Sequence, residues 1–457
     1  MIQLDHKNIL ADLVGNANGI TSGEIQRSEA RARRALTAFR KRSEDGSVGF
    51  PHLPFQAEVI NQIQQYAAEM RGSYDTVCVV GIGGSALGAW ALDCGIRGPH
   101  PVQGAFTAEH PRLVILDNVD PSFTQSALDS MDPRKTLVVV IAKSGGTAET
   151  VSTFLIVREW IKNGRGRIAA VTTDGKGDLF ELASREKYRP FWIPENVGGR
   201  FSVLSPVGLV PAALIGIDLR KLARGAMAMT HRCWQPDLDE NIALRAALCH
   251  WLLWTRKAKS IQVAFPYSNH LWGTAFWFRQ LWAESLGKAA DRAGKTVHTG
   301  QTPVAALGTT DQHSQVQLYI EGPNDKVFTF WAVGRFAAAG KIPRERLGLE
   351  AFDALGGQSL AKLIDAERRA TAAAMLEAGR PNCTFTLDRV DEEHLGAFLQ
   401  MMEFQTAFMG ELLGIDAFDQ PGVELAKKLT YGLMGRKGFE KYRRQFDAYE
   451  RKRTRAR

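Results

Sequence analysis

Two short loops carry residue types that are suited to holding a phosphate group. The first loop (81–85) reads GIGGS, and the second loop (143–147) reads KSGGT. Glycines let the backbone approach an anion closely, while hydroxyl groups and the N–H groups at the start of a helix donate hydrogen bonds to it. Lys143 adds a positive charge. The two loops together predict that the chain handles a phosphorylated small molecule.

Two better-known glycine loops match this sequence less well. Neither loop has Lys-Ser/Thr after its second glycine at the Walker A spacing, so ATP is not favoured. Gly81, Gly83 and Ala86 satisfy the permissive dinucleotide pattern, but the acidic residue expected about 20 residues later has no convincing counterpart. Glu109 lies in a Pro-rich approach to the next strand, and Asp117 comes late. One such loop could be explained by glycines that merely form a tight strand-to-helix turn. Two loops that also contain hydroxyl groups and a Lys are explained less well in this way.

Three ionisable residues in the second half of the chain could supply acid–base chemistry. Glu284 ends an aromatic-rich helical stretch, where lost solvation would raise the pKa of a carboxyl group towards that of a general base. An exposed Glu at a helix end fits that position equally well. His313 follows a Gly/Thr loop in the first turn of a predicted helix, and Lys427 lies early in another. A lone His is usually structural and a Lys usually solvated, so position alone assigns neither.

The elements that must position these residues alternate between apolar runs and helical periods. This alternation predicts an α/β fold with parallel sheets flanked by helices. Strands are expected at 76–80, 113–117, 136–142 and 168–173, and in a second series at 261–265, 304–307 and 327–332. Helices are expected at 271–285, 312–320, 392–413 and 422–433. In such sheets ligands bind at the carboxyl ends of strands, where both loops begin.

Length and composition predict a soluble protein of two or three domains. The 457 residues include no apolar run of about 20 residues and no secretory signal at the start, so the cytoplasm is expected. Five scattered cysteines, never in a CxxC pair, indicate reduced packing residues. The net charge is +8, of which residues 439–457 contribute +5. A solvated helix end explains this tail better than nucleic-acid binding, and we assign it no function.

Six stretches, spread over most of the chain, resemble the bacterial-type glucose-6-phosphate isomerase family. They are VVGIGGSALGAWAL (79–92), IAKSGGTAET (141–150), ENVGGRFSVLSPVGL (195–209), QLWAESLGK (280–288), GTTDQHSQ (308–315) and QPGVELAKKL (420–429), in the family's order. The joint presence of GGRFS, AESLGK, TTDQH and GVELAK is highly specific. Each motif belongs to a different element, so chance would rarely supply all four.

The resemblance implies two sugar-isomerase domains in an obligate homodimer. The implied segments are an N-terminal helical extension (1–50), two sugar-isomerase domains (51–230 and 231–420), and a C-terminal helix with the basic tail (421–457). The implied reaction interconverts glucose 6-phosphate and fructose 6-phosphate in glycolysis and gluconeogenesis. No metal or organic cofactor is implied, in agreement with a sequence that has no His/Cys/carboxylate cluster at metal-ligand spacing.

The resemblance also implies roles for individual residues. Glu284 would move a proton between C2 and C1 through a cis-enediol, and Arg200 would stabilise the charge of the enediolate. His313 and Lys427 would assist opening and closing of the sugar ring, and His313 would enter the site of the partner subunit. The implied substrate contacts are Gly84, Ser85, Lys143, Ser144, Thr147 and Gln420.

The second loop departs from the family's usual Ser-Lys-Ser-Gly-Thr-Thr. Ala142 replaces the first serine and Gly146 replaces the first threonine, so two hydroxyl groups are lost. A hydrogen bond to a charged group contributes about 1.5–3 kcal/mol, so we expect an active enzyme with a weakened hold on phosphate. Two alternatives stay open. One is a non-catalytic sugar-phosphate sensor on the same domains; the other is an isomerase of mannose or amino-sugar phosphates, because phosphate loops do not distinguish sugars.

Overall fold

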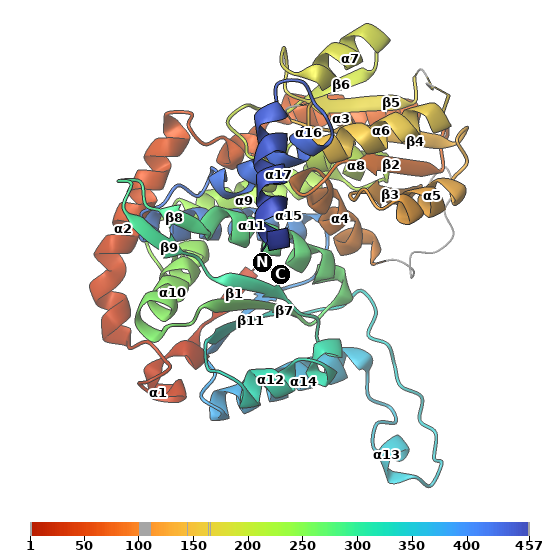
Figure 1. The fold of residues 1–457 in the computed structure, drawn as a ribbon. Helices are drawn as coiled ribbons and strands as arrows, with labels where there is room; N and C mark the ends of the chain where they lie inside the picture. Colours follow the sequence, from red (N-terminus) through yellow and green to blue (C-terminus); the bar gives the residue numbers. More distant parts are fainter. Residues whose placement is uncertain (1, 100–110, 144, 163, 165, 456–457) are drawn as a thin grey trace. The chain divides into compact units, whose positions relative to one another are not determined.

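Two β-sheets with helices on both faces form the centre of the fold (Figure 1). The structure is a computed structural model, and it describes residues 2–99, 111–143, 145–162, 164 and 166–455. These residues form two compact units, Met1–Ala417 and Phe418–Arg457, of which the first contains both sheets. The predicted α/β fold with parallel sheets is confirmed. The domain boundaries implied by the resemblance stay predictions.

The first sheet is entirely parallel, with the strand order β3-β2-β4-β5-β6. Its strands are β2 (Thr76–Val80), β3 (Arg112–Leu116), β4 (Thr136–Ile141), β5 (Ile168–Thr172) and β6 (Arg189–Trp192). One face packs on α5 (Pro121–Asp129), α6 (Ala148–Trp160) and α7 (Asp178–Glu186). The other lies under α4 (Gly84–Arg97) and α8 (Pro206–Leu214).

The second sheet has the order β1-β12-β11-β7-β10, in which only β1 is antiparallel to its neighbour. Its strands are β1 (Ile2–Asp5), β7 (Ile261–Pro266), β10 (Thr302–Ala305), β11 (Lys326–Val333) and β12 (Asn382–Leu387). Phe328 and Phe330 of β11 face α12 (Val316–Glu321) and α14 (Leu360–Glu377). Trp331 points to the opposite face, where it meets Phe278 of α11 (Trp272–Leu286) and Phe398 of α15 (Glu392–Leu413).

The parallel strands of the two sheets share one topology. In chain order, the first strand of each series, β2 or β7, lies between the second and the third. The helix after the first strand covers one face, and the helix after the third covers the other. A switch point therefore lies between β2 and β4 in the first sheet, and between β7 and β11 in the second. Ligands bind at such points at the carboxyl ends of the strands.

The seven strands that the sequence predicted correspond to β2, β3, β4, β5, β7, β10 and β11. Four of them, β2, β4, β5 and β11, are mostly apolar and buried along their whole length, as is typical of parallel strands covered on both faces. Among the strands, β1, β6, β12 and the hairpin of β8 (Lys288–Ala290) with β9 (Thr296–Thr299) were not predicted. The helix predicted from 312 begins only at Val316, because residues 310–313 form the one-turn 3₁₀ helix η5.

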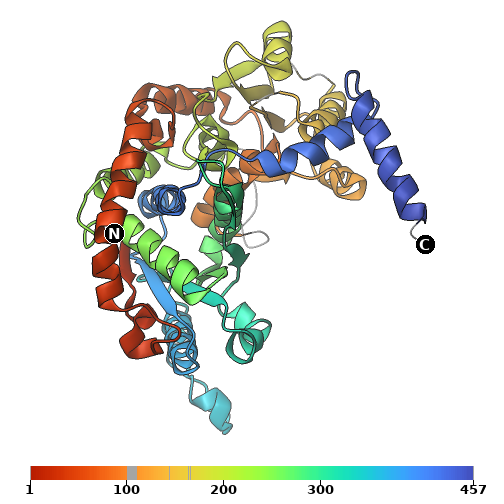
Figure 2. The same cartoon turned by 60° about the vertical axis from the view of Figure 1, so that its left-hand side comes forward.

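The helix α15 is buried along nearly all of its length, among α2 (Ser22–Glu44), α9 (Leu219–Cys233) and α10 (Ile242–Lys257), as Figure 2 shows. Two glycines make this packing possible. A Cβ atom on Gly225 would overlap the carbonyl oxygen of Glu393, and one on Gly396 would overlap that of Leu222. The backbones of α9 and α15 therefore lie in direct contact.

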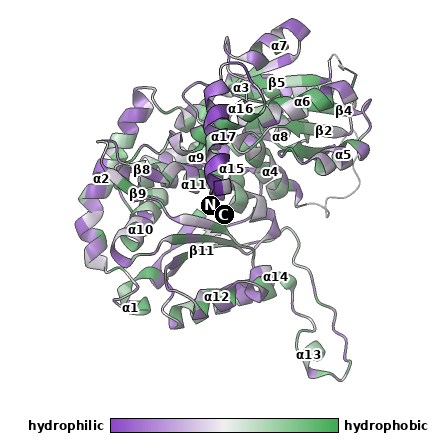
Figure 3. Ribbon diagram, viewed as in Figure 1, coloured by the Kyte–Doolittle hydropathy of each residue, from purple (hydrophilic) through white to green (hydrophobic). Residues whose placement is uncertain are grey.

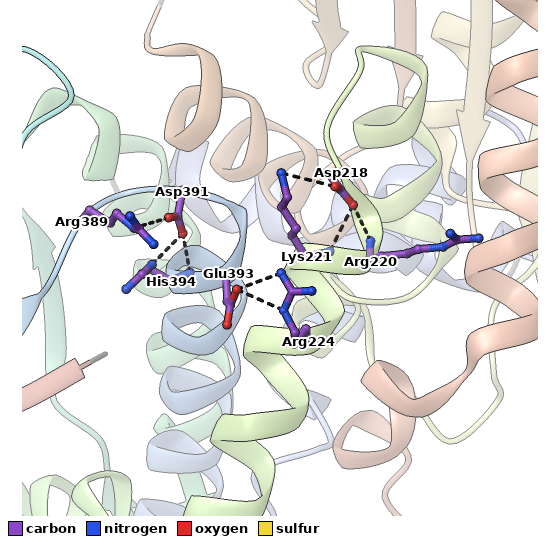
Figure 4. Close-up of polar contacts among 8 residues, drawn as sticks. All are labelled: Asp218, Arg220, Lys221, Arg224, Arg389, Asp391, Glu393 and His394. Carbon is purple, nitrogen blue, oxygen red and sulfur yellow. Dashed lines mark hydrogen bonds and ion pairs between the residues drawn. The ribbon is translucent and has the colours of Figure 1, made fainter.

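Polar contacts fix the N-termini of α9 and α15 (Figure 4). Asp391 caps α15 by accepting from the N–H of His394 at 2.9 Å, and its side chain also contacts the His394 ring at 2.6 Å. Asp218 caps α9 in the same way. Glu393 accepts from the Arg224 guanidinium at 3.0 Å and 3.1 Å, which links the two helices.

The C-terminal unit is a helical hairpin. It contains η6 (Pro421–Val423), α16 (Glu424–Leu433) and α17 (Glu440–Arg455). The rings of Tyr431 and Phe439 pack at the turn with centroids 5.0 Å apart. α17 carries the basic tail and is largely hydrophilic in Figure 3, with no buried residue.

Two further features follow the expectations from composition. All five cysteines are buried with free thiols, as packing residues would be. Within the described part of the chain, no helix has the length and apolar character needed to cross a membrane.

Candidate active site

The two predicted phosphate loops leave the sheet side by side. β2 and β4 are neighbouring parallel strands with Val80 opposite Val140, so both loops start at the same edge, at the switch point. α4 and α6 begin directly after the loops, and the described residues give neither helix a side-chain cap at its N-terminus. N–H groups at a helix start that lack a partner are donors for an anion, although in α4 Ser85 and Ala86 already donate to the carbonyls of Ile82 and Gly83. Ser85 and Thr147 lie at these two helix starts, whereas the predicted contact Ser144 lies outside the described residues.

Two glycines of the first loop allow it to touch the rest of the site. Gly83 has a φ of +59°, and a Cβ atom there would lie 2.9 Å from Nε2 of Gln280 in α11. A Cβ atom on Gly84 would overlap the carbonyl oxygen of Gly199, the residue before Arg200. The first loop therefore packs directly against both α11 and the turn that carries Arg200.

Glu284 and Arg200 form an ion pair beside this loop. Nη1 of Arg200 donates to Oε2 of Glu284 at 3.4 Å, although the residues are 84 positions apart in the sequence. Gln280, one turn earlier on α11, donates through Nε2 to Oε1 of Glu284 at 3.2 Å. The carboxylate of Glu284 is thus held at both oxygens.

The structure distinguishes the two surroundings that the sequence allowed for Glu284. Its aromatic neighbours Trp277 and Trp282 are buried in the core, whereas 34% of the Glu284 side chain is exposed. Helical geometry explains the difference, because adjacent residues on a helix point in different directions. Of the two interpretations that the sequence left open for Glu284, the partly exposed carboxylate at a helix end agrees with the structure.

Arg200 is itself firmly held. It lies in the one-turn 3₁₀ helix η3 (Gly199–Phe201), and only 1% of its side chain is exposed. Its Nε donates to the Ser285 hydroxyl at 2.7 Å, and its Nη2 donates to the carbonyl oxygen of Ala417 at 2.6 Å. A guanidinium with fixed donors and a permanent charge is suited to stabilising an anion that develops nearby.

Lys143 of the second loop points towards the segment before Arg200. Its Nζ donates to the carbonyl oxygens of Glu195 at 2.7 Å and Val197 at 2.9 Å. Partial burial lowers the pKa of the Lys143 amine. The second loop is thereby tied to the segment that leads into η3. A direct contact of the Lys143 side chain with substrate stays a prediction.

His313 lies in a different part of the same unit. It ends η5 (Thr310–His313), which follows β10 of the second sheet, and its side chain is exposed. Asp311 anchors this turn by accepting from the N–H of Leu307 at 2.7 Å, and Gln312 donates to the Tyr267 hydroxyl at 2.7 Å. Among the described residues, no hydrogen bond or ion pair joins His313 to Glu284 or Arg200.

The last two predicted residues belong to the C-terminal unit. Gln420 directly precedes η6, and Lys427 lies in α16, where its amine pairs with Glu424 at 3.1 Å. The side chain of Lys427 is 47% exposed. The first unit thus brings together Glu284, Arg200 and the two loops, while the roles of His313, Lys427 and Gln420 stay predictions.

A model of the phosphoglucose isomerase family matches residues 18–449. The chain belongs to this family. It is 44% identical to the glucose-6-phosphate isomerase of Carboxydothermus hydrogenoformans over 423 residues, which cover 90% of each chain. A solved structure of a hypothetical protein from Thermus thermophilus has a TM-score of 0.84 at 37% identity, covering 95% of this chain and all of that one.

A more distant family structure has the same fold. The glucose-6-phosphate isomerase of Chlamydia trachomatis matches with a TM-score of 0.74 at 24% identity, covering 86% of this chain and 77% of that chain. A likeness at this identity supports the fold alone. Both comparisons extend across the two sheets rather than one of them.

Two residues of this family site were not singled out from the sequence. Gln280 touches both the first loop and Glu284, and Ser285 holds Arg200. Both lie within the stretch QLWAESLGK (280–288). The spacing of four between Gln280 and Glu284 could have indicated that they share a helix face. Within the described residues, no group of three or more His, Cys, Asp and Glu is arranged to hold a metal ion.

Proposed function

We propose that this protein interconverts glucose 6-phosphate and fructose 6-phosphate. The observation that carries the proposal is the Arg200–Glu284 pair beside two helix N-termini that no side chain of the described residues caps, in a chain of the phosphoglucose isomerase family. A base next to an oxyanion stabiliser and a phosphate site are the parts that isomerisation of a sugar phosphate requires. The reaction belongs to glycolysis and gluconeogenesis, and the cytoplasm is its expected location.

The phosphate group would bind at the start of α4 and α6. Backbone N–H groups there and the hydroxyl groups of Ser85 and Thr147 would donate to its oxygens, and Ser144 would add a third hydroxyl. Lys143 would contribute positive charge nearby. Binding the phosphate at this fixed end would place the other end of the sugar, with C1 and C2, beside Glu284.

Glu284 would act as the base that transfers the proton. It would remove the proton from C2 of the open-chain aldose, giving a cis-enediolate with its charge on O1. After a proton passes from O2 to O1, Glu284 would return its proton to C1, and the C2 carbonyl of the ketose would form. The negative charge of the enediolate would face Arg200, whose guanidinium stays protonated throughout. Gln280 would orient the carboxylate through its 3.2 Å hydrogen bond to Oε1. Gln420 would contact the substrate.

Ring opening must come first, and His313 and Lys427 would serve it. An imidazole can exchange protons near neutral pH, and a protonated amine can donate a hydrogen bond to the ring oxygen or to a ring hydroxyl of the sugar. His313 would enter the active site of the partner in a homodimer. This assignment agrees with its exposed position on η5 and with the absence of any bond to Glu284 among the described residues.

An extended arm (334–359) supports the homodimer. It runs from the end of β11 to the start of α14, carries the short helix α13 (Glu350–Asp353), and reaches away from the second sheet in Figure 1. Four large apolar side chains on it are 43–63% exposed: Leu347, Leu349, Phe352 and Leu355. Apolar surface of this kind is stabilised when a second copy covers it.

A coupled assay in both directions without added metal tests the proposal. We expect turnover by the wild type and a loss of several orders of magnitude in Glu284→Gln, because the amide is not a base. Glu377→Gln, an exposed carboxylate at the end of α14, is the matched control and should keep full activity. A wild type that binds but does not convert the sugar phosphates would favour the sensor. Faster turnover of mannose 6-phosphate or an amino-sugar phosphate would favour a related isomerase.

A further inference from the structure

Arg200 donates two short hydrogen bonds inside the protein. Nε bonds to the Ser285 hydroxyl and Nη2 to the backbone carbonyl of Ala417, both of which are neutral. The carboxylate of Glu284 is farther away, at 3.4 Å, and is partly exposed. Ser285 itself is fully buried. Two short bonds to neutral groups thus fix the orientation of the guanidinium.

The second acceptor, the Ala417 carbonyl, is supported by charged residues around it. The preceding residue, Asp416, pairs with Arg42 of α2 at 3.0 Å. Glu411, near the end of α15, pairs with Arg292, whose Nη1 donates to Oε2 at 2.6 Å. Of the two acceptors, only the Ser285 hydroxyl is a side-chain group that a substitution can remove. Ser285 also lies directly after Glu284 on α11.

We infer that Ser285 is a positioning residue whose hydroxyl aims the Arg200 guanidinium at the enediolate and ties it to the helix that carries the base. The inference rests on the proposed isomerase function. Because Glu284 and Ser285 are adjacent on one helix, their positions are coupled, and this hydrogen bond fixes Arg200 relative to both. The hydroxyl would contribute to the transition state and little to substrate binding, since it is fully buried and bonded to Arg200.

The experiment combines Ser285→Ala with Arg200→Gln in a double-mutant cycle. We expect Ser285→Ala to lower kcat about tenfold with little change in KM, and to lower affinity for an analogue with a planar anion in place of C1 and C2. In the Arg200→Gln background the same substitution should have almost no effect on kcat. Ser285→Thr, which keeps the hydroxyl, should restore most of kcat.

Ser43→Ala is the matched control, because this hydroxyl is also buried and bonded, to His52 at 2.9 Å, but lies in α2. It should leave kcat unchanged. An unchanged kcat in Ser285→Ala, an equal loss in the Arg200→Gln background, or a rise in KM alone would overturn the inference. If Ser285→Ala does not fold, Ser285→Cys takes its place in the same cycle. A wild type without isomerase activity would overturn the proposed function, and the inference with it.

Discussion

In the first sheet the strands at the switch point are followed by short loops rich in glycine, whereas in the second sheet they are followed by bulky or long segments. After β2 and β4, the helices α4 and α6 start without side-chain caps in the described residues. After β7 comes Tyr267, a buried ring packed on Phe265 and Phe330. After β11 comes the arm (334–359).

The helix after β11 also has its first N–H groups in use. In α14, Leu360 donates to the Gly340 carbonyl at 2.8 Å, Ala361 donates to that of Ala339 at 3.1 Å, and Lys362 donates to the Ser359 hydroxyl at 3.2 Å. At the start of α4, Ser85 and Ala86 also donate, to the carbonyls of Ile82 and Gly83 at 3.1 Å and 3.0 Å, so the contrast in donors between the two sheets lies at α6. Topology fixes where a ligand can bind, and the loops decide whether donors are left for it.

The largest effect should come from disrupting the contact between the first loop and the turn that carries Arg200. Gly84→Ala places a methyl group into the carbonyl oxygen of Gly199, where backbone meets backbone and neither can move freely. We expect kcat/KM to fall at least about 100-fold, because a shift of Arg200 misplaces its charge. Gly334→Ala, directly after β11, is the control; its new Cβ would lie 3.2 Å from the nearest atom, and activity should be kept. Similar losses in both variants would contradict the comparison.

Replacing Lys143 shows whether its amine binds phosphate or instead holds the segment before Arg200 in place. In Lys143→Met the bonds to the Glu195 and Val197 carbonyls are lost. We expect kcat to fall about tenfold, with a smaller change in KM, because the segment before Arg200 loosens. Steady-state kinetics beside Arg335→Met, a cation just after β11, provide the measurement. A large rise in KM at constant kcat would instead mean that the Lys143 amine binds phosphate.

At the opposite end of the second sheet, substitutions should alter stability rather than activity. Lys259, before β7, is buried and donates to the Asn324 carbonyl at 2.6 Å and to the Asn324 side chain at 2.8 Å. Lys259→Met leaves these acceptors unpaired and should lower the free energy of unfolding by about 1–3 kcal/mol. Urea denaturation measures this change, and kcat should stay constant. A loss of kcat at unchanged stability would contradict the expectation that this end of the sheet affects stability and not activity.

The same lysine gives a pH dependence with a defined sign. Burial lowers the pKa of Lys259 to about 8, whereas the ordinary pKa of a lysine is about 10.4. Between about pH 8 and about pH 10.4, the unfolded chain therefore binds more protons than the native one. The free energy of unfolding of the wild type, relative to Lys259→Met, should therefore rise as pH increases through this window. A relative stability that falls with pH would show that the charged amine is favoured.

The smallest effect concerns the residue where the second loop departs from its family. Ala142→Ser returns a hydroxyl group to the carboxyl end of β4, at a position that is 5% exposed. If this hydroxyl reaches the phosphate, KM should fall, by up to about tenfold, while kcat changes little. Gly334→Ser, the residue after β11, should leave KM unchanged. A KM in Ala142→Ser no lower than that of the parent would contradict the weakened phosphate hold.

The sequence by itself determined the elements whose signal is local. Apolar runs marked β2 from Thr76 to Val80 and the helical period marked α15 from Glu392 to Leu413, with the same ends as in the structure. The short strands β1, β6 and β12 escaped, because they mix polar residues or proline with apolar ones and are stabilised by pairing with distant strands. The phosphate loops and the family's motifs could likewise be identified from the sequence.

Only the tertiary structure decided how those motifs act on one another. It joined Arg200 to Glu284 across 84 positions, brought Ser285 and Gln280 into the site, and turned the Lys143 amine to the segment before Arg200. It also determined that α14 has its first donors satisfied by its own arm. The physical reason is that propensity and periodicity act over a few neighbouring residues, whereas exposure, charge compensation and free hydrogen-bond donors depend on groups that folding brings together from distant parts of the chain.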